Sequence, residues 1–150
     1  MKPLSSDDLY TFAEKLGIKH FDVVMHTDLE NSKAKDHENL IINLDHGEEG
    51  THWVAFVNNP SLRYCFYFDS YGVVPSEIVR DYSFTTNKAL YYSDSMYQHL
   101  KSVLCGWYSL FMLYEIDVNN KDPKQIIKLF NESNPQENEN RIIRFAKQIN

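Results

Sequence analysis

Four residues spread along the chain have the side chains that a cysteine nucleophile needs for acyl transfer: His52, Asp69, Gln98 and Cys105. Such a nucleophile needs a base within hydrogen-bond reach and a third group that orients the base. A histidine can act as the base, and an aspartate beside it fixes the tautomer of the imidazole. A glutamine amide can donate a hydrogen bond to the developing oxyanion. The set covers every role, in the chain order His, Asp, Gln, Cys.

Each of these residues also has a plainer interpretation when it is taken singly. A free cysteine is among the most buried residue types, and Asp69 fits a turn-starting or capping aspartate. His52 fits a surface or hydrogen-bonded histidine, and Gln98 fits an exposed polar side chain. The interpretation as a site therefore depends on the elements that bring the four together.

The element expected to carry Cys105 is a helix from Leu104 to Ile116, which is apolar almost all round and is therefore expected to be buried. Cys105 falls at its N-terminus, where free N–H groups and the positive end of the helix dipole stabilise a thiolate. The backbone N–H of Cys105 is a second expected oxyanion donor. Gly106 lets the backbone approach a ligand closely.

Two β-branched and aromatic runs, His52–Val57 and Tyr64–Phe68, are predicted to position the base. Turn-forming residues at 58–61 separate them, which indicates a hairpin. If the two strands pair, His52 and Asp69 lie at corresponding ends of neighbouring strands.

The remaining elements follow from periodicity and capping. Helices are expected after Ser5 or Ser6 up to Gly17, over Pro75–Arg80, and from the pairs Asp122-Pro123 and Asn134-Pro135. Apolar runs stand at Phe21–Met25, Leu40–Leu44 and Leu90–Tyr92, of which the last two are predicted strands; Asp28–Glu38 is an expected loop and Asp45–Gly50 a turn. This order predicts one α+β domain over residues 1–150, with a mixed central sheet flanked by helices.

Composition excludes several classes of protein. The 150 residues include 15 Lys and Arg against 21 Asp and Glu, a formal net charge of −6, which argues against sequence-independent nucleic-acid binding. No apolar run reaches about 18 residues, so no membrane span is expected, and the N-terminus lacks a signal-peptide core. Two cysteines cannot form a disulfide framework, which indicates a reducing intracellular compartment. Of these two, Cys65 lies within a predicted strand and fits a core residue.

Metal and nucleotide chemistry have no supporting motif. His20, His26, His37 and His46 are scattered, and neither HExxH nor paired CxxC spacing occurs. The five glycines are isolated, so phosphate-binding and dinucleotide-binding loops are absent. We expect neither a metal nor an organic cofactor.

Three strings taken together resemble the adenain family of viral cysteine proteases, the adenovirus-type endopeptidases, which are related to the SUMO and ubiquitin-like-protein proteases. They are GTHWVAF, YCFYFDSYG and LCGWYSLFML, with Asp69 seventeen residues after His52 and Gln98 seven residues before Cys105. The resemblance extends from KLG near residue 15, through LIINL, to the helix after Cys105. It implies a papain-like, adenain-type fold with the nucleophile at the start of a buried helix.

The resemblance also implies the catalytic roles. Cys105 would be the nucleophile and His52 the general base, which later acts as the acid toward the leaving amine. Asp69 would orient His52, and Gln98 would stabilise the oxyanion. Trp53 would line the substrate cleft beside the histidine.

Substrates of the family carry small residues, often glycine, next to the cleaved bond, and in adenoviruses they are virion precursors. A narrow cleft with aromatic walls explains this preference, since a Cβ would clash. The resemblance therefore implies a cysteine endopeptidase, with Trp53 and Gly106 at the substrate, that matures viral precursors in the host cytoplasm or nucleus or in the virion. We expect it to be a monomer.

The chain departs from the adenovirus members, which are longer, are activated by a disulfide-linked viral peptide and use DNA as a cofactor. No cysteine stands between Asp69 and Gln98, where that linkage would form, so we expect no covalent activator. The acidic charge gives no basic track for DNA, and Arg141, Arg144 and Lys147 fit a solvated helix face. Activation by a noncovalently bound peptide is an alternative that the sequence leaves open.

Two alternatives use the same residues. The first is a deconjugating protease for a ubiquitin-like modifier with a Gly-Gly tail; such enzymes typically carry an Asp directly before the nucleophile, where this chain has Leu104. The second is a catalytically silent binding module, against which the four intact positions argue.

Overall fold

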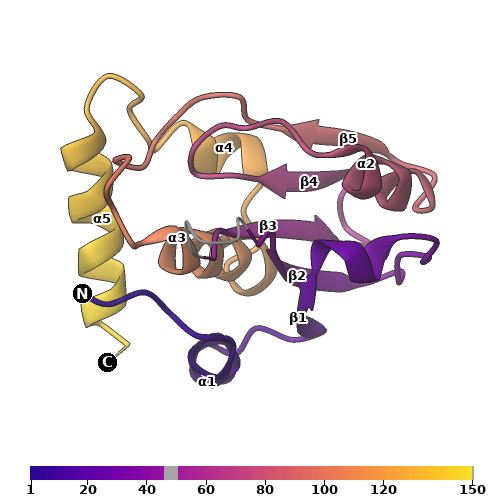
Figure 1. The fold of residues 1–150 in the computed structure, drawn as a ribbon, viewed down its shortest axis with the longest axis horizontal. Helices are drawn as coiled ribbons and strands as arrows, with labels where there is room; N and C mark the ends of the chain where they lie inside the picture. Colours follow the sequence, from indigo (N-terminus) through magenta and orange to yellow (C-terminus); the bar gives the residue numbers. More distant parts are fainter. Residues whose placement is uncertain (46–50, 150) are drawn as a thin grey trace.

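A five-stranded sheet in the order β1-β2-β3-β4-β5 forms the centre of the computed structural model (Figure 1). The structure describes residues 1–45 and 51–149, so the turn predicted over Asp45–Gly50 lies outside the described residues except for Asp45. The central pairs β2–β3 and β3–β4 are antiparallel, whereas the outer pairs β1–β2 and β4–β5 are parallel. The strands are β1 (Phe21–Met25), β2 (Glu38–Asn43), β3 (Trp53–Asn58), β4 (Tyr64–Phe68) and β5 (Ala89–Tyr92). This mixed sheet with its helices confirms the predicted α+β class.

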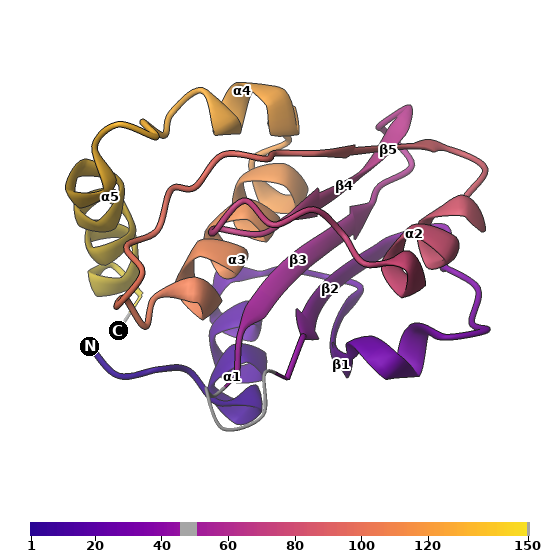
Figure 2. The ribbon, with the colours of Figure 1, turned by 45° about the horizontal axis from the view of Figure 1, so that its top comes forward.

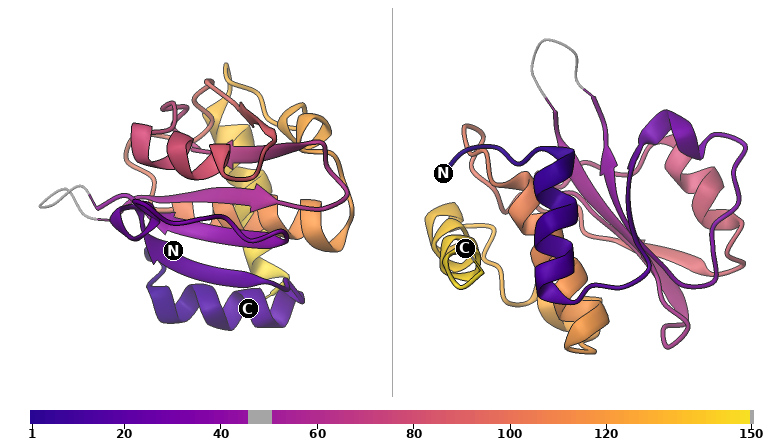
Figure 3. Two further views of the ribbon diagram at one scale, coloured as in Figure 1. Left: turned by 90° about the vertical axis from the view of Figure 1, so that its right-hand side faces the viewer. Right: turned by 90° about the horizontal axis from the view of Figure 1, so that it is seen from below.

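The buried helix α3 (Cys105–Leu113) packs against β3 on one face of the sheet. All of its residues are buried, and a π-helical turn (Tyr114–Val118) continues it. The helix α1 (Ser6–Leu16) lies on the same side, and α5 (Pro135–Lys147) packs against α3 (Figures 2 and 3). The predicted apolar helix is therefore confirmed, because a helix without a polar face must be covered on all sides.

The opposite face of the sheet is covered by α2 (Glu77–Phe84) and a short 3₁₀ turn (His26–Leu29), as the right panel of Figure 3 shows. Side chains of a strand alternate between the two faces, so Phe66 and Phe68 of β4 belong to the core under α3. Cys65 and Tyr67 belong to the core under α2. The prediction that Cys65 is a core residue is confirmed, since it is fully buried.

Local capping signals fix most helix boundaries. The Ser5 side chain accepts the backbone N–H of Asp8, and Gly17 ends α1 in the left-handed conformation with φ 78°. Asp122 caps α4 (Pro123–Ile127) and Asn134 caps α5, as predicted. Within the described part of the chain, no helix has the length and hydrophobicity that a bilayer span requires.

The helix predicted over Pro75–Arg80 was misplaced. It begins at Glu77 and continues to Phe84, because Ser76 takes the cap and accepts the N–H of Val79 at 3.3 Å. Pro75 therefore precedes the helix instead of opening it. The strand predicted over Tyr64–Phe68 is confirmed at both ends, and the ends of the other predicted strands lie within two residues of the observed ones.

Candidate active site

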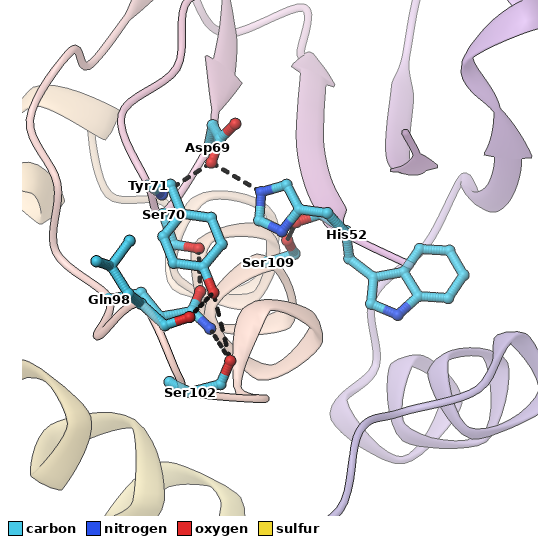
Figure 4. A network of polar contacts seen from close by, with 9 residues as sticks. His52, Asp69, Ser70, Tyr71, Gln98, Ser102 and Ser109 are labelled. Carbon is cyan, nitrogen blue, oxygen red and sulfur yellow. Dashed lines mark hydrogen bonds and ion pairs between the residues drawn. The ribbon is translucent and has the colours of Figure 1, made fainter. Parts of the chain in front are cut away.

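The hairpin of β3 and β4 brings His52 and Asp69 together. His52 directly precedes β3, Asp69 directly follows β4, and the antiparallel register pairs Ala55 with Phe68. The two side chains meet at the same end of the hairpin, where His52 Nε2 lies 2.8 Å from Asp69 Oδ1 (Figure 4). Both residues are buried. A carboxylate can only accept, so Nε2 carries the proton and Nδ1 is the nitrogen left for another partner.

Cys105 is the first residue of α3 and interacts with His52. Both residues line one cavity of about 660 Å³, and Cys105 is 8% exposed to solvent. Burial lowers the pKa of His52, but hydrogen bonds to Asp69 and Cys105 and the charges of both outweigh burial and raise it to about 9. His52 is therefore protonated at neutral pH, which is the form that stabilises a neighbouring thiolate.

The N-terminus of α3 lies at the same cavity, because Cys105 is the first residue of the helix. Leu104 occupies the N-cap and supplies no side-chain hydrogen bond to the first turn. The first N–H groups of a helix have no partner within the helix, and they carry the positive end of its dipole. Cys105 thus stands where negative charge on sulfur or on a carbonyl oxygen is favoured.

Gln98 is fully buried, so its interpretation as an exposed side chain is wrong. Ser70 Oγ donates to Gln98 Oε1, and Gln98 Nε2 donates to the carbonyl of Ser102 at 3.1 Å (Figure 4). The carbonyl of Ser70 also accepts the N–H groups of Tyr97 and Gln98, at 2.9 and 3.1 Å. An amide nitrogen carries two hydrogens, so the bond to Ser102 leaves a second N–H on Gln98.

A tight turn after β4 holds Asp69 in place. The N–H of Gly72 donates to the carbonyl of Asp69 at 2.8 Å, and the N–H of Tyr71 donates to Asp69 Oδ1 at 2.8 Å. Gly72 has φ 77°, and a Cβ there would lie 2.6 Å from the backbone of Ser95. Only glycine fits this turn without moving the neighbouring loop.

Trp53 lines the cavity and packs against Gly106. The indole Nε1 of Trp53 donates to the carbonyl of Leu4 at 3.0 Å. A Cβ on Gly106 would stand 3.2 Å from Leu4 Cβ and 3.3 Å from Trp53 Cδ1, so the missing side chain permits this contact. Pro3, Leu4 and Trp53 all line the cavity, which means that the first residues of the chain form one of its walls.

Sequence patterns did not single out Tyr71, Ser70, Ser102 or Leu4. The ring of Tyr71 stacks on the imidazole of His52, with centroids 4.8 Å apart and planes 27° apart. The string DSYG contained a signal for Tyr71, because an aspartate two residues before it is typical of a side-chain-to-backbone turn. The contact of Leu4 spans 49 residues and had no local signal. In residues 1–45 and 51–149, no three His, Cys, Asp or Glu side chains are placed to hold a metal ion.

Comparisons with known proteins find a family and a shared fold. A family model described as adenovirus endoprotease matches residues 17–144. A crystal structure of the ASFV pS273R protease gives a TM-score of 0.64 at 14% identity, covering 91% of this chain and 65% of that chain. The SUMO protease Ulp1, with its catalytic cysteine oxidised to a sulfinic acid, gives 0.51 at 13% identity, covering 91% and 74%. No curated protein matches the sequence significantly.

The extent of these matches decides what they establish. A selenomethionine crystal structure of the ASFV protease gives a TM-score of 0.53 at 19% identity and covers 69% of this chain. The chain spans 42% and 65% of the two ASFV structures, and at these identities the likeness is one of fold. The family model, in contrast, covers most of the chain. The chain therefore belongs to the adenovirus endoprotease family.

Proposed function

We propose that the chain is an endopeptidase that cleaves next to small residues, glycine above all, and matures viral precursor proteins. The observation that carries this proposal is the arrangement around one imidazole. His52 meets Asp69 through Nε2 at 2.8 Å and interacts with Cys105, which begins a buried helix. A base held between an orienting carboxylate and a thiol is the arrangement that nucleophilic catalysis requires.

In the first chemical step, the thiolate of Cys105 attacks the scissile carbonyl and a carbon–sulfur bond forms. The carbonyl electrons move onto oxygen, where the backbone N–H of Cys105 and the second N–H of Gln98 stabilise the charge. His52 gives its proton to the leaving nitrogen as the carbon–nitrogen bond breaks, which releases the amine product. His52 then takes a proton from water, the hydroxide attacks the thioester, and the carboxylic acid product leaves as the Cys105 thiolate re-forms.

The preference for glycine is supported by the walls of the cavity. Trp53 and Tyr71 line it beside His52 and Cys105, and Leu4 packs against Trp53. A substrate backbone that passes these rings must approach Cys105 closely, and a Cβ next to the scissile bond would collide with them.

Removal of a ubiquitin-like modifier is the second candidate, and the structural likeness to Ulp1 favours it. The same catalytic residues would serve an isopeptide bond after a Gly-Gly tail. Leu104 stands directly before the nucleophile, where such enzymes typically carry an aspartate. We therefore rank precursor cleavage first.

A substrate-profile assay with the purified chain tests both candidates. We expect wild-type protein to cleave a Leu-x-Gly-Gly reporter peptide and Cys105→Ser to be inactive with an unchanged circular dichroism spectrum. The matched control is Cys65→Ser, which should retain turnover. Cleavage by Cys105→Ser would refute the assignment of the nucleophile. An absolute requirement for a folded modifier, with no cleavage of short peptides, would reverse the ranking.

We further propose that the protease acts as a monomer, in the reducing cytoplasm or nucleus of the host or in the virion, without a metal, an organic cofactor or a disulfide-linked activator. Both cysteines are free, and both are buried. Arg144 and Lys147 are exposed on α5, but a net charge of −6 argues against a DNA cofactor. Turnover that rises when DNA or a basic viral peptide is added would contradict an independent enzyme; a noncovalent peptide activator would then be the first revision.

A further inference from the structure

Tyr71 contacts both members of the proposed acid–base pair, yet it has no role in the steps above. Its backbone N–H donates to Asp69 Oδ1 at 2.8 Å, on the same oxygen that meets His52. Its ring stacks on the imidazole of His52, with centroids 4.8 Å apart. One residue therefore touches the base and the group that orients the base.

The hydroxyl of Tyr71 reaches the loop that precedes the nucleophile. It is directed at the carbonyl oxygen of Leu100 at 3.4 Å and at that of Ser102 at 3.3 Å; Figure 4 shows Tyr71 beside Ser102. Burial raises the pKa of this hydroxyl, so it stays protonated and remains a donor. The carbonyl of Ser102 also accepts from Gln98 Nε2 at 3.1 Å, and Tyr71 and Gln98 therefore share one acceptor.

We propose that Tyr71 is a positioning residue, which holds the imidazole of His52 with its ring and the amide of Gln98 through the shared carbonyl of Ser102. The stack restricts rotation of the imidazole and covers one of its faces against water. The hydroxyl fixes the carbonyl of Ser102, and that carbonyl sets the direction of the Gln98 N–H groups. This inference rests on the proposed function, since it takes His52 as the base and Gln98 as the oxyanion donor.

A double-mutant cycle tests the link through Ser102. Tyr71→Phe keeps the ring and removes the hydroxyl, and we expect kcat to fall about fivefold with KM unchanged, the effect of one hydrogen bond. In the Gln98→Ala background the same change should have no further effect, because the group that it positions is gone. Two effects that simply multiply would overturn the link.

A matched control lies at the far end of β4. The hydroxyl of Tyr64 makes a hydrogen bond of 2.6 Å to Asp122, remote from the cavity. Tyr64→Phe should therefore leave kcat and KM unchanged. A loss equal to that of Tyr71→Phe would overturn the positioning role, because removal of any half-buried tyrosine hydroxyl would then have this effect.

The stack is tested without substrate by nuclear magnetic resonance of the His52 Nε2 proton. Tyr71→Leu removes the ring at similar bulk, and we expect this proton to exchange with water about tenfold faster or more. Tyr71→Phe should exchange at the wild-type rate, because its ring is retained. Equal exchange rates in all three proteins would overturn the stacking role.

These readouts separate failure of the positioning role from failure of the proposed function. If wild-type protein cleaves no glycine-containing peptide, the proposed function is refuted. The positioning role is then still decided by two measurements: the exchange rate of the His52 Nε2 proton, and the side-chain amide resonances of Gln98 in Tyr71→Phe. If wild-type protein cleaves and both Tyr71 variants match it in kcat, proton exchange and amide resonances, the positioning role alone is refuted.

Discussion

The two cysteines stand on opposite faces of the sheet, and their surroundings differ far more than their burial. Cys65 is 0% exposed and Cys105 is 8% exposed. The thiol of Cys65 donates to the carbonyl of Ala89 at 3.5 Å and lies 3.8 Å from the hydroxyl of Thr86. Burial raises the pKa of the Cys65 thiol. Cys105 has a protonated histidine, a helix N-terminus and a cavity around it instead.

This difference shows that burial alone does not distinguish a reactive thiol from a structural one. The hydrogen-bond partners of Cys65 are neutral, and burial raises the pKa of its thiol more than the charge of Lys88 lowers it. At Cys105 the positive charge of His52 is itself maintained by Asp69. We therefore expect the reactivity of Cys105 to depend on His52 and Asp69 as well as on the cysteine itself.

Removal of each thiol in turn is the strongest test of the difference between the two cysteines. Cys105→Ala removes the proposed nucleophile, and we expect kcat to fall by about 10⁴-fold or more. Cys65→Ala should keep kcat within about twofold of wild type, because it contacts no group that takes part in the reaction. Kinetics on a glycine-containing reporter measure both. Equal losses would show that the two faces are not functionally distinct.

Removal of the charge behind His52 should have the next largest effect. Asp69→Asn can donate where the carboxylate accepts, which favours the wrong imidazole tautomer, and we expect kcat/KM to fall by about 10²- to 10⁴-fold. Asp81→Asn, an exposed aspartate on α2, is the control on the opposite face. A wild-type rate for Asp69→Asn would remove the aspartate from the proposed triad.

Selective alkylation compares the reactivity of the two thiols without a substrate. At neutral pH, iodoacetamide should label Cys105 and leave Cys65 unmodified in the folded protein, as read by mass spectrometry of peptides. The His52→Ala variant should lose this selectivity, because the cation beside the thiol is gone. Equal labelling of both cysteines, insensitive to His52, would contradict the catalytic assignment.

The pH dependence follows from the raised pKa of His52. Activity needs the protonated imidazole, so kcat/KM should decline as the pH rises through about 9. Asp69→Asn should move this limb to lower pH, since a hydrogen bond and a charge that raise the pKa are lost. Because the pKa is higher in the folded chain than the unfolded value of about 6.5, His52 stabilises the fold fully below that pH. This contribution is lost as the pH rises to about 9. If kcat/KM declines at the same high pH in Asp69→Asn as in wild type, His52 is not the group whose titration causes the decline.

The smallest expected difference is in stability. Cys65→Ala leaves a gap in a closed core, and we expect the free energy of unfolding to fall by about 1–2 kcal/mol. Cys105→Ala opens toward an existing cavity and should cost less than Cys65→Ala does. Urea titrations of both variants measure the two values. The reverse order would mean that the core under α2 repacks.

Local signals in the sequence accounted for much of the fold. The apolar run from Leu104, the hairpin around residues 58–61 and the caps at Ser5 and Asn134 each depend on neighbours within a few residues. The types and spacing of His52, Asp69, Gln98 and Cys105 predicted a common site, and the structure brings them to one end of the β3–β4 hairpin and the start of α3. The helix at Pro75 was misplaced because two neighbouring residues were both acceptable starts.

The surroundings of the site could not be predicted in the same way. Gln98 meets Ser70 across 28 residues because its loop folds back on the turn after β4, and such a contact depends on tertiary packing that no local pattern encodes. Leu4 reaches Trp53 across 49 residues. The packing of Leu4 and Trp53 against Gly106 likewise had no local signal in the sequence.

The hydrogen bond between Trp53 and Leu4 has a consequence for the time course of folding. It joins the first residues of the chain to a cavity whose lining also includes His52, Tyr71 and Cys105. Contacts of such long sequence separation form late, because loop closure costs entropy before the contacts offset it. Proteolytic activity should therefore return after helical circular dichroism during refolding. A chain that has not completed folding would therefore contain Cys105 and His52 but would lack the complete substrate cleft that cleavage requires.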